Sequence, residues 1–183
     1  MEAIINSTIL VFISEMGDKT QLLALVLAAR FKKPIPILLG IFIATLANHF
    51  LASYVGVFIT QYFSPTMLRL ILATTFIGFG LWILIPDKDE GLNENYKWGA
   101  FVTTLIAFFM AEMGDKTQLA TVALGARYAS TTAVTFGTTL GMLLANAPVV
   151  FFGKWFTDRI PMKWVHRIAS VLFIGFGIAC AFV

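Results

Sequence analysis

The sequence predicts an all-α integral membrane protein with six transmembrane helices, arranged as two inverted-topology repeats of three helices each. Three observations lead to this fold class: the composition, a series of six apolar runs, and an internal repeat. Of the 183 residues, 58% are hydrophobic and 13% are charged. Soluble domains carry about 25% charged residues, so this chain has too little polar surface to face water on all sides.

Each of the six apolar runs is long enough for the roughly 20 residues that a helix needs to cross a bilayer. The runs cover residues 4–29, 34–58, 66–86, 98–125, 130–152 and 164–183. They are continuous and do not alternate between apolar and polar residues, so they predict helices rather than the strands of a barrel. The first run lacks the basic start of a secretory signal and is expected to be a mature helix.

The basic residues sort by connector. Nine lie in or beside the connectors after the first, third and fifth runs: Arg30, Lys32, Lys33, Lys88, Lys97, Lys154, Arg159, Lys163 and Arg167. Only Arg69 and Arg127 lie on the opposite side. Because cytoplasmic loops are enriched in lysine and arginine, these three connectors are predicted to be cytoplasmic and both termini to lie outside the cytoplasm.

A shift of 97 residues aligns the two halves of the chain. Eleven of seventeen residues are identical between 15–31 and 112–128, and the same shift superposes FIGFG at 76–80 on FIGFG at 173–177. The sequence therefore predicts two three-helix repeats, residues 1–86 and 98–183, joined by a cytoplasmic connector at 87–97. Because three is odd, the second repeat must be inverted in the membrane relative to the first. The FIGFG segments, and the small-xxx-small spacings Gly40/Ala44 and Gly137/Gly141, are expected to allow close helix packing.

The most polar element of the repeat is EMGDKTQ, found at 15–21 and again at 112–118. Both copies fall near the middle of an apolar run, where a charge facing lipid costs roughly 2.5–3.5 kcal/mol. The charged side chains must therefore face the protein interior. Three-residue spacing places both carboxylates of each copy on one helix face. Gly17 and Gly114, between the acids, are expected to act as hinges where the helix unwinds locally.

If the two copies meet across the repeat axis, four carboxylates converge: Glu15, Asp18, Glu112 and Asp115. Hard divalent cations prefer such oxygen ligands, and four acids with two lysines leave a charge of −2 for one cation to neutralise. Without a metal, crowded carboxylates are expected to take up protons, which permits metal/proton exchange. Further oxygen ligands or supporting groups are expected from Ser14, Thr20, Gln21, Asn48, Thr117, Gln118 and Asn146.

The roles of the other polar groups stay open at this stage. Lys19 and Lys116 could tether the acids of an empty site or donate hydrogen bonds elsewhere, and a helical Glu15–Lys19 ion pair that only stabilises the bundle is the simplest alternative. His49 could carry protons, whereas an interhelical hydrogen bond would explain it and both asparagines structurally. Neither a nucleophile–base arrangement nor a phosphate-binding loop is evident, so enzymatic catalysis is not expected. Nucleic-acid binding is not expected either, because the basic residues sort by connector, the pattern of membrane topology.

The doubled E-x-G-D-K-T motif resembles the signature of the Gdt-type manganese/calcium transporter family, which includes MneA-like bacterial manganese exporters and belongs to the lysine-exporter superfamily. The resemblance covers essentially the whole chain. It implies a secondary-active transporter in a bacterial inner membrane that exports Mn²⁺ or Ca²⁺, with the acids of both motifs as the metal site, protons as the coupling ion and no cofactor. Amino-acid export, which the superfamily allows, is the alternative, followed by a non-transporting membrane subunit or sensor.

Overall fold

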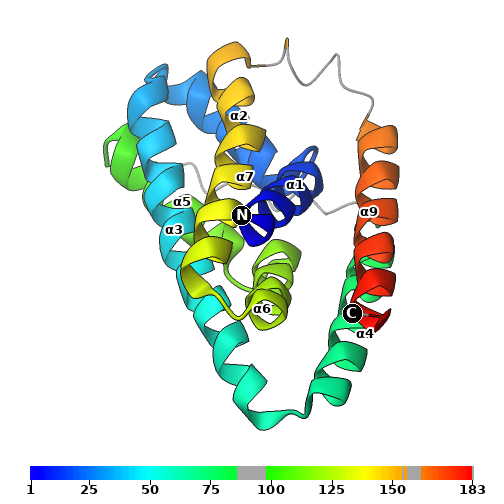
Figure 1. The fold of residues 1–183 in the computed structure, drawn as a ribbon. Helices are drawn as coiled ribbons and strands as arrows, with labels where there is room; N and C mark the ends of the chain where they lie inside the picture. Colours follow the sequence, from blue (N-terminus) through cyan, green and yellow to red (C-terminus); the bar gives the residue numbers. More distant parts are fainter. Residues whose placement is uncertain (86–97, 154, 156–161, 183) are drawn as a thin grey trace.

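A computed structural model describes residues 1–85, 98–153, 155 and 162–182. The described residues form helices and no strands (Figure 1). In chain order these are α1 (Glu2–Glu15), α2 (Lys19–Phe31), α3 (Pro34–Ile59), the 3-10 turn η1 (Thr60–Tyr62), α4 (Pro65–Trp82), α5 (Ala100–Glu112), α6 (Lys116–Tyr128), α7 (Thr131–Phe152) and α9 (Met162–Phe182). The predicted connector 87–97 and the basic residues Lys88, Lys97, Lys154 and Arg159 lie outside the described residues.

The first and fourth apolar runs are not continuous helices, which corrects the sequence-based prediction. Each run is interrupted inside EMGDKTQ, between α1 and α2 and between α5 and α6. The glycines allow the break: Gly17 has φ +83° and Gly114 has φ +75°, values that favour glycine. The aspartate after each glycine then starts the next helix as its N-cap. Asp18 accepts a hydrogen bond from the Lys19 backbone N–H at 2.6 Å, and Asp115 accepts one from Thr117 at 3.3 Å.

Four helical segments of the described chain are long and apolar enough to cross a membrane. They are Pro34–Tyr62, Pro65–Trp82, Thr131–Phe152 and Lys163–Phe182. The helix Ala100–Glu112 is apolar but shorter, since the motif break ends it. The chain is thus an all-helical membrane protein in which two of the predicted spans are each divided into two shorter helices.

The two halves make matching contacts around α3 and α7. α3 packs on α5 where a Cβ added to Gly40 would lie 2.8 Å from the Cβ of Thr104. α7 packs on α1 where a Cβ on Gly137 would lie 2.9 Å from the Cβ of Ser7. Gly137 and Ser7 are the residues that the 97-residue shift relates to Gly40 and Thr104. Glycine at these points permits close helix approach, as the sequence predicts.

α4 and α9 lie side by side at one edge of the molecule (Figure 1). A Cβ on Gly80 would meet the Ser170 carbonyl oxygen at 2.9 Å, and one on Gly177 would meet that of Ala73 at the same distance. These two pairs are again related by the shift. The first glycine of each FIGFG segment does not pack in this way, because no atom of the described residues of another helix lies within 4 Å of a Cβ added to Gly78 or Gly175.

One pair of related contacts differs between the halves. α3 and α6 pack backbone to backbone: a Cβ on Gly125 would lie 2.5 Å from the Ser53 carbonyl oxygen, and one on Gly56 would lie 2.9 Å from the Ala126 nitrogen. At the related α7–α2 contact, a Cβ on Gly153 would meet only the end of the Leu25 side chain, at 3.8 Å. The α3–α6 contact is therefore tighter than its α7–α2 counterpart.

Candidate metal centre

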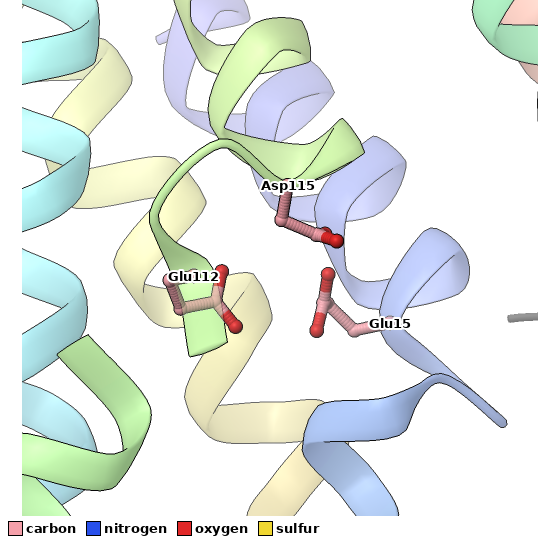
Figure 2. A group of neighbouring side chains, drawn as sticks. All are labelled: Glu15, Glu112 and Asp115. Carbon is pink, nitrogen blue, oxygen red and sulfur yellow. The ribbon is translucent and has the colours of Figure 1, made fainter. Parts of the chain in front are cut away.

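The two helix breaks bring three carboxylates together in the interior. Glu15 is the last residue of α1, Glu112 is the last residue of α5, and Asp115 caps α6. One oxygen of each lies within 4.8 Å of the others, and all three residues are buried. Figure 2 shows the carboxylates turned towards a common point, with Glu15 approaching from one motif and the other two from the second.

The fourth predicted acid, Asp18, is outside this group of three. Its Oδ2 lies 3.1 Å from Lys116 Nζ, and Asp115 Oδ1 lies 2.9 Å from Lys19 Nζ. Each lysine thus pairs with the aspartate of the other motif, and the two ion pairs cross between the repeats. The helical Glu15–Lys19 ion pair considered from the sequence depended on a continuous helix, which the break at Gly17 removes.

The threonines of both motifs bind the same glutamate. Thr20 Oγ1 donates to Glu15 Oε2 at 2.6 Å, and Thr117 Oγ1 donates to Glu15 Oε1. Among the described residues, neither oxygen of Glu112 has a hydrogen-bond donor. His49 lies beside Glu112, with its Nε2 3.9 Å from Oε2, which is beyond hydrogen-bond distance. Among the described residues, hydrogen bonds therefore hold the Glu15 carboxylate, whereas none holds that of Glu112.

The motif glutamines stabilise the unwound backbone. Gln21 Oε1 accepts a hydrogen bond from the Gly17 N–H at 2.9 Å, and Gln118 Oε1 accepts one from Gly114 at 2.7 Å. Gln21 Nε2 also donates to the Ala145 carbonyl oxygen at 2.9 Å, which ties α2 to α7. In this conformation both glutamine oxygens are occupied by the backbone N–H groups that the helix break leaves without a helical partner.

The remaining candidates take different places around the centre. Asn48 Nδ2 donates to the Phe109 carbonyl oxygen at 3.0 Å, near the end of α5. Asn146 Nδ2 donates to Met142 in its own helix at 3.0 Å, and Ser14 Oγ donates to Val11 at 3.0 Å, also in its own helix. The Asn146 Oδ1 is buried and has no donor among the described residues. Asn48 therefore connects two helices, whereas Asn146 keeps an unused acceptor.

Sequence reasoning missed a polar contact behind His49. Ser53 Oγ and Thr135 Oγ1 are 2.7 Å apart, joining α3 to α7, and Thr135 Oγ1 donates to the His49 carbonyl oxygen at 3.5 Å. Ser53 follows His49 by four residues, so the two lie on one face of α3. That spacing could have indicated from the sequence that Ser53 lies near His49. Thr135 could be found only from the packing of α7 on α3.

The chemistry of the centre is that of a site for a hard divalent cation. If all are ionised, the four acids and two lysines of the motifs carry a net charge of −2, which a doubly charged ion neutralises. Carboxylate oxygens suit Mn²⁺, Ca²⁺ and Mg²⁺. Burying negative charge without enough positive charge beside it is strongly unfavourable. The two lysines do not offset all four carboxylates if these are ionised, so the group favours a cation between the three acids.

Comparison with known proteins agrees with this chemistry. The family described as "Divalent cation/proton antiporter GDT1" matches residues 3–91 and 100–182. A Vibrio cholerae protein named "Putative manganese exporter" is 50% identical over 183 residues, covering 100% of this chain and 92% of that protein. A Synechocystis protein named "GDT1-like protein sll0615" is 29% identical over 93% of this chain and 92% of its own. No solved structure matches the chain significantly.

Proposed function

The chain belongs to the divalent cation/proton antiporter GDT1 family, and on that basis we propose that it exports Mn²⁺ from the cytoplasm in exchange for protons, with Ca²⁺ as the alternative cation. The main support is the group of buried carboxylates drawn from both motifs, Glu15, Glu112 and Asp115. As a member of this family the chain transports divalent cations. The choice of Mn²⁺ follows the name of the Vibrio relative.

In the proposed site, these three carboxylates bind the cation. Asp18 does not bind it, and its negative charge is offset by Lys116. Asn146 Oδ1, buried without a donor, is a further oxygen available to the cation. The glycine breaks position the acids, and the glutamines hold the broken backbone. Helices interrupted at mid-membrane are a common way for transporters to place charged groups at a substrate site.

We further propose that the chain crosses a bacterial inner membrane six times, with α1–α2 and α5–α6 each forming one interrupted span. Residues 1–86 and 98–183 then form two inverted repeats, the connector 87–97 is cytoplasmic and both termini lie outside. Gly40 and Gly137 make corresponding contacts in the two halves, and so do Gly80 and Gly177, which supports the repeat. The excess of basic residues supports the orientation.

This topology places two positions that the 97-residue shift relates on opposite sides of the membrane. Lys32 and Ala129 are both exposed, both follow the end of a helix in the left-handed conformation, and are related by the 97-residue shift. In a Cys180→Ala background, a membrane-impermeant thiol reagent added outside intact cells should label Ala129→Cys but not Lys32→Cys. Labelling of both or neither from outside contradicts the inverted arrangement.

The function itself is tested by flux into liposomes that contain only this protein. Wild type should move Mn²⁺ against a proton flux recorded by a pH dye, and Glu112→Gln should not. Glu2→Gln, which changes an exposed acid at the start of α1, is the matched control and should transport normally. Lysine flux without Mn²⁺ flux would favour the amino-acid exporter, and no flux of either would favour a non-transporting subunit.

A further inference from the structure

The two lysines of the motifs are paired across the repeats but are not equivalent. Lys19 binds Asp115, which belongs to the group of three carboxylates, whereas Lys116 binds Asp18, which does not. The Lys19 side chain is 33% exposed and that of Lys116 is 7% exposed. The motif lysine is therefore bound to a proposed cation ligand in the first copy, and it is buried in the interior in the second copy.

The position of Lys19 makes its ammonium a rival of the cation. Asp115 Oδ1 is 2.9 Å from Lys19 Nζ. An ammonium is a compact, strongly hydrated point charge on a flexible stem, so it can occupy a carboxylate and leave it again without unfolding the backbone. A divalent cation that uses the same carboxylate must compete with that charge. Because the Lys19 side chain is partly exposed, the ammonium can move away from Asp115 without entering the packed interior.

We propose that Lys19 is a tethered competitor for the transported cation: its ammonium occupies Asp115 in the empty centre, and the cation binds by displacing it. This inference rests on the proposed function, because it takes Asp115 as a ligand. Lys19 thus acts as a positioning residue that lowers affinity and aids release, since the ammonium returns to Asp115 as the cation leaves. A transporter must release its substrate as well as bind it, and an internal counter-charge helps release.

Lys116 has a different role in this scheme. It is buried and forms its ion pair with Asp18, the aspartate outside the group of three carboxylates, so in this scheme it acts as a permanent counter-charge. Removing one member of a buried ion pair leaves the other charge uncompensated and is strongly destabilising. Lys116→Met is therefore expected to lower thermal stability, whereas Lys19→Met is expected to change Mn²⁺ affinity.

The first experiment measures Mn²⁺ affinity by calorimetry on purified protein, with transport kinetics in liposomes. Lys19→Met should bind Mn²⁺ about tenfold more tightly, a difference worth about 1.4 kcal/mol, with a lower KM and a lower kcat because release slows. Lys19→Arg keeps the charge and should stay closer to wild type in affinity. Lys33→Met, at an exposed lysine outside the centre, is the control. Unchanged or weaker Mn²⁺ binding by Lys19→Met overturns the inference.

A second measurement uses wild type and so does not depend on a variant folding. The protein is treated briefly with an acylating reagent, with Mn²⁺ or with a chelator, and modification is quantified by mass spectrometry. Mn²⁺ should increase modification of Lys19 by releasing it from Asp115, whereas exposed Lys33 should be unaffected. Equal modification of Lys19 at saturating Mn²⁺ contradicts displacement.

The two levels of the proposal fail in different ways. If wild type binds no divalent cation, the proposed function is wrong and the role of Lys19 falls with it. If wild type binds Mn²⁺ and loses it in Glu112→Gln, while Lys19→Met binds no more tightly than wild type, the cation site stands and only the competitor role is wrong.

Discussion

The two EMGDKTQ segments are identical in sequence, yet their glutamates have different surroundings. Glu15 accepts hydrogen bonds from Thr20 of its own motif and Thr117 of the other. Glu112 has no donor among the described residues and faces His49 at 3.9 Å. The motif therefore supplies the same groups twice, and the surrounding helices decide how each copy uses them.

The packing of the halves differs in the same region. α6 lies tightly against α3 at Gly125 and Ser53, whereas α2 meets α7 at Gly153 only through the Leu25 side chain. α6 carries Thr117 and α2 carries Thr20, so the helices whose packing differs are the ones that follow the two motif breaks. Two inverted repeats need not be equivalent in any single state of a transporter, because alternating access moves one relative to the other.

The largest expected effect is on Mn²⁺ binding. It shows whether the two glutamates, despite their different surroundings, belong to one shared site. Glu15→Gln and Glu112→Gln should each weaken Mn²⁺ binding by more than about 100-fold, beyond the loss usual for groups that only support a metal ligand. Calorimetry on both variants measures this, with Glu2→Gln as control. If one variant keeps wild-type affinity, the glutamates do not share a site.

The next effect concerns the threonines. Thr117→Val and Thr20→Val should each destabilise the protein by about 1.5–3 kcal/mol, the range for a hydrogen bond to a charged group. Thermal unfolding in detergent measures this. Thr74→Val, an exposed threonine that bonds only to its own helix, is the control.

A double-mutant comparison then separates the two glutamates. Because Thr117 donates to Glu15, the cost of Thr117→Val should shrink in a Glu15→Gln background and persist in a Glu112→Gln background. The reverse pattern would mean that each threonine serves the glutamate of its own motif, as sequence symmetry alone suggests.

One substitution tests the difference in packing between the α3–α6 contact and the related α7–α2 contact. The shift relates Gly125 of α6 to Ala28 of α2, so Gly125→Ala makes α6 resemble α2 at this point. The added methyl group would lie 2.5 Å from the Ser53 carbonyl oxygen, and such overpacking typically costs about 1–3 kcal/mol. Thermal unfolding should show that loss. Gly175→Ala should not be destabilising, because the added methyl group has open space among the described parts of the chain. Equal stability of both variants contradicts the tight contact.

The smallest expected effect is a difference in stability between variants of the two motif glutamines. Gln21→Ala loses hydrogen bonds to Gly17 and Ala145, whereas Gln118→Ala, at a more exposed position, loses one hydrogen bond to Gly114 among the described residues. At about 1 kcal/mol per hydrogen bond, Gln21→Ala should be the more destabilising of the two by about that amount. Thermal unfolding of the pair is the measurement, and an equal loss would show that the Ala145 contact adds nothing.

Local patterns in the sequence were sufficient for several parts of the fold. The apolar runs predict where helices lie, and the glycines between the acids predict where the chain unwinds. The paired glycines at Gly40 and Gly137 predict close packing, which the contacts of both residues confirm. These features depend on neighbouring residues or on a repeat that can be read along the chain.

The details of the centre depend on contacts between distant segments. Three-residue spacing placed Glu15 and Asp18 on one face only if the helix were continuous, but Asp18 caps a new helix and pairs with Lys116. The crossed ion pairs and the Thr117–Glu15 hydrogen bond join residues roughly 100 positions apart, as the Thr117–Glu15 separation of 102 shows. Two identical motifs give no local signal to distinguish their partners.

The central claim, one cation site built from both motifs, is tested most directly by anomalous diffraction from crystals grown with Mn²⁺. We expect a single manganese peak between the Glu15, Glu112 and Asp115 carboxylates. Two separate peaks, one in each motif, or no peak among these three residues at saturating Mn²⁺, would contradict the shared site.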